Sequence, residues 1–199
     1  MRILIIFIAL FLISGISLNA QSDTLVDVRD GKIYKTTQIG QQIWMAENLN
    51  FKTEKYSYYY ASKAENGEKY GRLYRWESAE KACPTGWHLP TDEEWQVLEK
   101  ELGITEEQVA KENTWRGTDQ AIKLVSDTSL NFIMLFGGYR NPPSNSFLIG
   151  MQSFFWTATD TEAHAWYRQM RDGSGQIFRR TRPKSWGMSV RCVKDEENN

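Results

Sequence analysis

The chain has 199 residues, a length that suits one domain and is sufficient to bury a hydrophobic core. Its 24 basic side chains nearly balance 25 acidic ones, which argues against a protein that coats nucleic acid. Eight tryptophans favour either a core built on Trp or a surface that binds carbohydrate.

The first twenty residues have the order of a secretory signal peptide. Arg2 gives a positive start, residues 3–13 are an unbroken apolar run, and residues 14–20 are small and polar. The apolar run is shorter than the roughly 20 residues that a membrane-spanning helix needs. We therefore expect cleavage after Ala20, no membrane span in the mature protein, and a secreted, periplasmic or cell-surface location. An uncleaved N-terminal anchor is the alternative.

The segment that follows is predicted to form short strands and loops. Residues 25–34 alternate around Asp30-Gly31, which is a strong hairpin signal, and a further strand is expected at 43–44 after the turn at Gly40. The tyrosine-rich stretch 56–60 is interpreted as a partly buried loop. Residues 63–69 are polar and are also interpreted as a loop.

The clearest local signal is a capped helix that begins after Thr91. Glu94 stands three residues later and completes a capping box, while Trp95, Leu98 and Leu102 share one helical face. Gly103 is expected to stop this helix. A second capping pattern predicts a shorter helix from residue 105 to about 112.

Beyond residue 113 the sequence predicts a compact antiparallel sheet, because apolar runs are short and turn residues recur. The expected strands are 132–136, 154–159, 165–170, 176–179 and 188–193. No composition break marks a second domain, so residues 21–195 are interpreted as a single domain and 196–199 as a disordered tail.

Cys83 and Cys192 are the only cysteines in the chain. In an exported protein such a pair is expected to form a disulfide bond. The bond would connect the end of the domain to its middle. Two free buried thiols are the alternative.

Five phrases in order carry a resemblance to a known family. They are DGKIYKTTQIGQQIWMAENL (30–49), GRLYRWESAEKACPTGWHLPTDEEW (71–95), GGYR (137–140), FFWTAT (154–159) and KSWGMSVRCV (184–193). The chain resembles the Fibrobacter succinogenes major paralogous domain over about residues 26–195. That family looks like a branch of the C-type-lectin-like fold, related to the sulfatase-modifying enzymes and the variable receptors.

The resemblance implies an α+β fold in which two helices flank a twisted antiparallel sheet and long loops carry the ligand site. It also implies secretion and a binding role, with no established reaction. A sulfatase-modifying activity needs reactive thiols, and both cysteines here fall where the family's structural bridge is expected. We therefore expect a protein that is not an enzyme and needs no cofactor.

No metal site is expected from the sequence. His88 and His164 have no ligand partner at close spacing, whereas a zinc site draws on several His or Cys side chains. The calcium-binding tripeptides of lectins with this fold are absent. Asp160, Glu162 and Asp172 could contribute to a calcium site, but a solvated loop is the better interpretation.

The most distinctive segment runs from residue 178 to 186, where arginines replace the polar loop that is common in the family. An arginine fork binds carboxylate, phosphate or sulfate in a bidentate manner, and an aromatic ring can stack on a sugar. The hypothesis is a basic and aromatic patch formed by Tyr167, Arg168, Arg171, Arg180, Arg182 and Trp186. The alternative is a solvated hairpin whose arginines pair with the acidic helix start at 92–94.

The predicted function is therefore a secreted recognition module. Its expected partner is a surface glycan, an anionic polysaccharide or a surface protein, and nucleic acid is not expected. A structural cell-envelope protein without a small ligand is the first alternative. A sulfatase-modifying enzyme is the second, and the cysteine count disfavours it.

Overall fold

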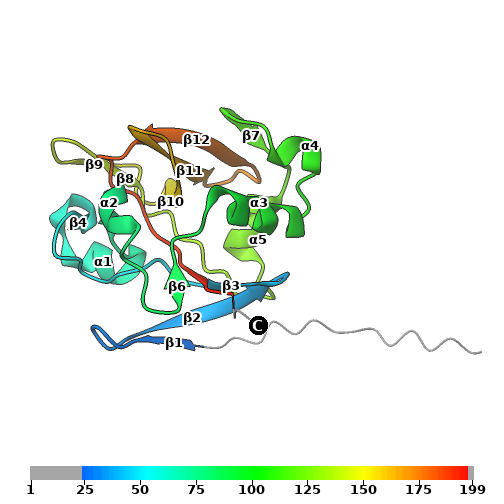
Figure 1. Ribbon diagram of the computed structural model, residues 1–199. Helices are drawn as coiled ribbons and strands as arrows, with labels where there is room; N and C mark the ends of the chain where they lie inside the picture. Colours follow the sequence, from blue (N-terminus) through cyan, green and yellow to red (C-terminus); the bar gives the residue numbers. More distant parts are fainter. Residues whose placement is uncertain (1–23, 197–199) are drawn as a thin grey trace, which may run out of the picture.

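The computed structural model describes residues 24–196, in which two larger antiparallel sheets enclose short helices (Figure 1). The lower sheet in that view contains β1 Thr24–Asp27, β2 Lys32–Ile39, β3 Gln42–Met45, β6 Trp87–His88 and β13 Val193–Lys194. Its strand order is β1-β2-β3-β13-β6. The signal-peptide prediction concerns residues 1–20, which lie outside the described residues.

The upper sheet has the order β10-β11-β12-β7. It contains β7 Thr114–Arg116, β10 Gln152–Asp160, β11 His164–Arg171 and β12 Ile177–Pro183. Two small hairpins pair β4 Ser57–Tyr58 with β5 Leu73–Tyr74, and β8 Tyr139–Asn141 with β9 Asn145–Phe147. The mixed α+β class predicted from the sequence is confirmed.

The helices are short and lie between or beside the sheets. They are the 3₁₀ turn η1 Tyr60–Ser62 and the helices α1 Ala64–Tyr70, α2 Trp76–Ala79, α3 Asp92–Glu101, α4 Glu106–Val109 and α5 Gln120–Ser126. In Figure 1, α3 and α5 lie between the two larger sheets. None of the helices in residues 24–196 combines the length and apolar character that crossing a membrane requires.

The N-terminal half of the prediction is largely confirmed. The first hairpin forms with Asp27 opposite Lys32, and β3 follows the turn at Gly40. At the start of α3, the Thr91 hydroxyl accepts from the Glu94 amide at 3.1 Å, and the Glu94 carboxylate accepts from the Thr91 amide at 2.7 Å. The capping box that the sequence predicts is therefore present, and it satisfies two donors at the helix start.

α4 is shorter than predicted because arginine side chains supply the hydrogen bonds that a further helical turn would have made. It ends at Val109, not at residue 112. The Val109 carbonyl accepts from Arg116 at 2.6 Å, and the Ala110 carbonyl accepts from Arg179 at 3.2 Å. These two donors satisfy carbonyls that another helical turn would otherwise have used.

Two further predictions of local structure are wrong. The loop predicted at 63–69 is instead the helix α1, residues 64–70. Gly67 lets the Tyr59 ring pack directly against this helix, since an added Cβ would lie 2.0 Å from that ring. Residues 132–136 form no strand, although Phe132 and Met134 are buried. α5 also had no counterpart in the prediction.

The predicted strand 188–193 is reduced to β13 at its end. The amides of residues 74, 156 and 49 bond in turn to the carbonyls of residues 188, 189 and 190, and the amide of residue 45 bonds to the carbonyl of residue 192. The segment thus changes partner almost at every residue. No continuous ladder can form, because a ladder needs one neighbouring strand over several residues.

The core is built on tryptophan, as the composition suggests. Trp44, Trp95 and Trp156 are fully buried, and the rings of Trp44 and Trp95 meet edge to face with their centroids 5.0 Å apart. Trp87 is only half-buried. The predicted disulfide bond between Cys83 and Cys192 is confirmed and connects the segment after α2 to the residue before β13.

Candidate functional site

The pleat of β11 and β12 divides the predicted patch between two faces of the upper sheet. Arg168 lies opposite Arg179, and its neighbour Tyr167 lies opposite Arg180. Since successive side chains of a strand point to opposite faces, the first pair and the second pair cannot share a surface. The first pair turns toward α3, and the second pair turns away from it.

Arg168 belongs to the interior and not to a binding patch. Its side chain is fully buried, with Nη1 2.5 Å from Asp92 Oδ1 and Nε 2.5 Å from Glu99 Oε1. These carboxylates lie on α3, one at its start and one two turns later. The prediction that Arg168 contacts a ligand is therefore wrong, because its charge is already neutralised inside the protein.

Two more arginines complete this buried ionic network. Arg179 Nη2 lies 2.7 Å from Asp92 Oδ2, and Arg116 Nη1 lies 2.8 Å from Glu99 Oε2. Burial alone would raise the pKa of the Asp92 carboxyl, but hydrogen bonds and charges from Arg179 and Arg168 outweigh it and lower the pKa to about 2. The alternative in which arginines pair with the helix start is thus partly correct, although the pairing is buried.

Tyr167 also lies too deep to stack on a sugar. Only 1% of it is exposed, and the Phe154 ring packs against it with centroids 6.0 Å apart. Burial, the largest effect, raises the pKa of its hydroxyl against the opposing charges of Arg182 and Arg180. Tyr167 therefore lies in the interior beneath these two arginines and is not accessible to a ligand.

The exposed side of the patch is formed by arginines above stacked rings. The rings of Trp186 and Tyr139 are nearly parallel, at 9°, with centroids 4.9 Å apart. The Arg182 guanidinium lies 5.1 Å from the centre of the Trp186 ring and 6.0 Å from that of Tyr167. Arg180 is exposed, and within residues 24–196 neither Arg180 nor Arg182 forms an ion pair.

Arg171 lies away from this group. Its guanidinium is 4.5 Å from the Trp115 ring on β7. Arg182 pairs with Ala165, which stands six residues before Arg171 on β11. At about 3.3 Å per residue this separates the two positions by roughly 20 Å along the strand. The structure does not bring Arg171 together with Arg180 and Arg182.

The hairpin β8–β9 adds two residues that the sequence analysis did not assign to the site. Tyr139 stacks on Trp186, and the next residue, Arg140, exchanges backbone hydrogen bonds with Gly187 at 2.8 and 2.7 Å. The Arg140 guanidinium lies 3.9 Å from the Tyr58 ring. The phrase GGYR was the only signal for this pair, because a pairing with residues 186–187 has no local pattern.

We call this group the basic–aromatic surface. Its members are Tyr139, Arg140, Arg180, Arg182 and Trp186. Guanidinium groups beside ring faces can bind a carboxylate or sulfate while the rings contact an apolar sugar face.

One of the three carboxylates considered for calcium and one of the two histidines are engaged in ion pairs. Asp160, considered as a calcium ligand, forms an ion pair with Lys184. His88 bridges Glu94, at 2.8 Å, and Asp195, at 2.6 Å. In the part of the chain that the structure describes, no group of three or more His, Cys, Asp or Glu side chains is arranged to hold a metal ion.

These features define an α+β domain with a buried ionic network on one face of its upper sheet and a basic–aromatic surface on the other. A family model described as the Fibrobacter succinogenes major domain matches residues 37–194, more than half of the chain. The chain belongs to this family, as its sequence phrases suggested. No curated protein and no solved structure matches it.

Proposed function

We propose that this protein is an exported recognition module that binds a surface glycan, in particular an anionic polysaccharide, through the basic–aromatic surface. The supporting observation is that Arg180 and Arg182 have no ion-pair partner among residues 24–196 and that Arg182 lies beside the stacked Trp186. A surface protein is the alternative partner. The proposal involves no catalysed reaction.

The geometry of β12 suits a repeating anionic ligand. Arg180 and Arg182 stand two residues apart and therefore face the same side of the sheet, about 7 Å from each other. Each guanidinium can bind a carboxylate or sulfate by donating two parallel hydrogen bonds to it. Trp186 offers a ring next to Arg182, where the apolar face of a sugar can pack.

Export is supported by the sequence of residues 1–20 and by the Cys83–Cys192 bond, since disulfides persist in oxidising compartments. The same bond bears on the enzyme alternative. It occupies both cysteines of the chain, so no thiol is left to act as a sulfatase-modifying enzyme would require. A C-type-lectin-like relationship is proposed from the sequence phrases and is compatible with helices beside antiparallel sheets.

Binding to a glycan panel tests the proposal. The exported form of the protein would be measured against neutral glycans, uronic-acid polysaccharides and sulfated polysaccharides, each with calcium and with a chelator. A variant with Arg180→Ala, Arg182→Ala and Trp186→Ala, which removes two positive charges, would be compared with Arg171→Ala, which removes one positive charge roughly 20 Å from Arg182.

We expect the native protein and the Arg171→Ala variant to bind the anionic polysaccharides, and the triple variant to lose binding while remaining folded. Equal loss in both variants would mean that net charge, not this surface, attracts the ligand. No binding by the native protein would reject a glycan ligand and favour a protein partner or a structural role in the envelope.

A further inference from the structure

The tyrosine-rich segment belongs to a small sheet that adjoins the basic–aromatic surface. β4 pairs with β5, and Tyr74 on β5 exchanges backbone hydrogen bonds with Met188 at 2.8 and 3.0 Å. The preceding residue, Gly187, exchanges backbone hydrogen bonds with Arg140 on β8. β4, β5, residues 187–188 and β8 therefore lie side by side. The backbones of β5 and β8 are two strand spacings, roughly 10 Å, apart.

On one face of this small sheet, the Arg140 side chain reaches Tyr58. Successive side chains of a strand alternate between faces, so Gly187 shares its face with Arg140 and Leu73. The spacing agrees, since a Cβ on Gly187 would lie 3.2 Å from the Arg140 Cβ and 3.5 Å from the Leu73 Cβ. Because Gly187 has no side chain, Arg140 can extend across it. The Arg140 guanidinium lies 3.9 Å from the centre of the Tyr58 ring, and Tyr58 pairs with Leu73.

A second arginine and a second tyrosine continue this face. Arg75 follows β5 in an extended conformation, two residues after Leu73, so its side chain leaves the backbone on the face that carries Leu73. The Arg75 guanidinium lies 4.5 Å from the centre of the Tyr56 ring. We call Tyr56, Tyr58, Arg75 and Arg140 the arginine–tyrosine cluster.

Neither arginine of the cluster is neutralised by the protein. Within residues 24–196, Arg75 and Arg140 form no ion pair, and their side chains donate no hydrogen bond. Arg75 Nε is enclosed, but the terminal nitrogens of both guanidinium groups are not. Each side chain is half-buried, and a charge that is partly withdrawn from water interacts more strongly with an anion than a fully solvated charge does. Both arginines therefore keep donors for an anionic ligand.

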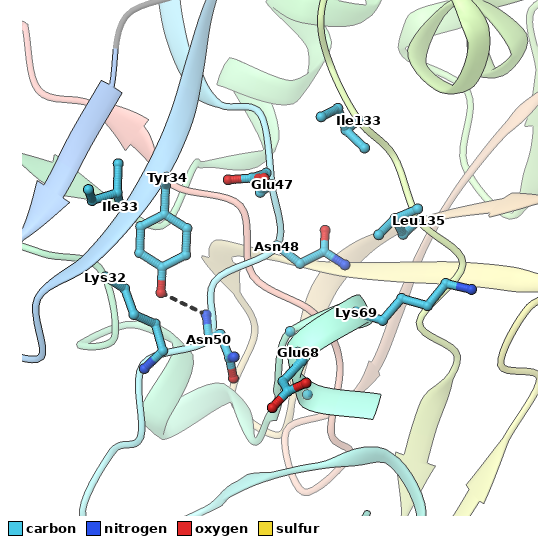
Figure 2. Close-up of a pocket in the computed structure, with 12 residues that line it drawn as sticks. Lys32, Ile33, Tyr34, Glu47, Asn48, Asn50, Glu68, Lys69, Ile133 and Leu135 are labelled. Carbon is cyan, nitrogen blue, oxygen red and sulfur yellow. Dashed lines mark hydrogen bonds between the residues drawn. The ribbon is translucent and has the colours of Figure 1, made fainter. Parts of the chain in front are cut away.

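The hollows near the cluster carry no net charge. The pocket of about 240 Å³ in Figure 2, whose lining includes Gly67 of α1, has two lysines and two glutamates in its wall. The hollow of about 420 Å³ beside Tyr56 is also lined by two lysines and two glutamates, which are Glu54, Lys55, Glu77 and Lys81. Neither hollow continues the positively charged surface beyond Arg75.

We infer that the anionic polysaccharide of the proposed function is bound at two places, and that its chain runs from the basic–aromatic surface across Arg140 to Arg75. This inference rests on the proposed function. Trp186, which lies beside Arg182, directly precedes Gly187. Arg140 extends over Gly187, so the two sites share one backbone segment. A polymer that reaches both sites gains from their linkage, whereas a short oligomer occupies one. The ligand is therefore a long chain with repeated carboxylate or sulfate groups.

The dependence of affinity on chain length tests the inference. Tetrasaccharide and dodecasaccharide fractions of heparin and of oligogalacturonate would be titrated into the native protein and into Arg75→Gln. We expect the native protein to bind the dodecasaccharide roughly ten- to a hundredfold more tightly than the tetrasaccharide, which is the effect of one further charge-assisted contact. In Arg75→Gln this preference should fall several-fold, while the affinity for the tetrasaccharide stays the same.

Arg171→Gln is the matched control. It removes the same charge from an arginine that also lies against an aromatic ring and that forms no ion pair within residues 24–196, and it stands apart from both sites. Long chains offer more binding registers to any site, and the preference that remains in Arg75→Gln measures that effect. The control is expected to keep the full native preference for the dodecasaccharide.

Amide shifts in the ¹⁵N-labelled native protein give a second measurement, which decides the question if Arg75→Gln unfolds. The dodecasaccharide should shift residues 180–187, residues 56–58 and Arg75, whereas the tetrasaccharide should shift only the first group. If the triple variant loses binding but Arg75→Gln keeps the native preference for length, the inference is overturned and the proposed function stands. If neither ligand binds the native protein, the proposed function fails and the inference fails with it.

Discussion

The guanidinium of Arg168 and the carboxylate of Asp92 form an ion pair at 2.5 Å, and both side chains are almost completely withdrawn from solvent. The pair joins the middle of the upper sheet to the start of α3. It accounts for an arginine that the sequence alone placed on the surface.

Asp92→Asn should destabilise the protein strongly. The change leaves Arg168 and Arg179 buried without one of their two carboxylate partners, and breaking a buried pair in this way costs about 3–5 kcal/mol. Urea unfolding measures the difference. Asp172→Asn, at an exposed carboxylate, is the control and is expected to change stability by no more than about 0.5 kcal/mol.

Asp92 should also make the stability of the protein decrease at low pH. Its folded pKa of about 2 lies below the ordinary value of 3.8, so the stabilisation is complete above pH 3.8 and is lost as the pH falls through about 2. The loss amounts to about 2 kcal/mol. Unfolding measured from pH 5 to pH 2 should show it in the native protein. An equally steep fall in Asp92→Asn would show that other carboxyl groups are responsible.

His88 should produce the opposite dependence at high pH. The hydrogen bond that the His88 ring donates to Glu94 is the largest effect and, with the bond donated to Asp195, raises the pKa of His88 from 6.5 to about 9, although burial opposes it. The stabilisation is therefore complete below pH 6.5 and is lost as the pH rises through about 9. The melting temperature of the native protein should fall between pH 6 and pH 10, and that of the His88→Gln variant should change less over the same range. An NMR titration midpoint near 6.5 would contradict the assignment.

Trp95→Ala and Trp87→Ala should differ clearly in stability. Trp95 is fully buried between Trp44 and Phe155, so its loss should cost about 3–5 kcal/mol. Trp87 is only half-buried, so its replacement by Ala should lower the free energy of unfolding by less. Chemical unfolding of the two variants side by side gives the comparison, and equal losses would mean that Trp87 contributes packing that its exposure does not reveal.

Replacing both Cys83 and Cys192 by alanine should lower stability by about 4 kcal/mol, because the bond closes a loop with a sequence separation of 109. Unfolding of the double variant would be compared with that of the native protein, oxidised and reduced. If reduction leaves the native protein as stable as before, the bond contributes little to its stability.

The parts of the fold that the sequence predicted are those with local signals. The hairpin at Asp30-Gly31 and the helix after Thr91 depend on turn and capping chemistry within a few residues. The helix α1 was missed because it contains Gly67, which reads as a loop residue in the sequence. The glycine is required by close packing against the Tyr59 ring, which lies outside the helix. Segment 188–192 was predicted as a strand because its apolar pattern does not reveal that its partners change along the chain.

Only the part of the candidate site that is local in sequence was predicted. Arg180, Arg182 and Trp186 are close in sequence, and the structure keeps Arg182 and Trp186 together. Arg168 is buried because its side chain points to the inner face of the sheet. A shift of β11 by one residue in register would have placed it on the outer face. Tyr139 and Arg140 joined the surface through a contact between distant segments, which no local pattern encodes.

The position of β13 between β3 and β6 affects how the protein can fold. Residues 193–194 occupy an inner place in a sheet whose other strands all come from the first half of the chain. That sheet stays open until nearly the whole polypeptide is available, since β3 and β6 meet only through β13. Under the export proposed above, this delay helps to keep the chain competent for translocation, and the Cys83–Cys192 bond can then secure the inserted strand in an oxidising compartment.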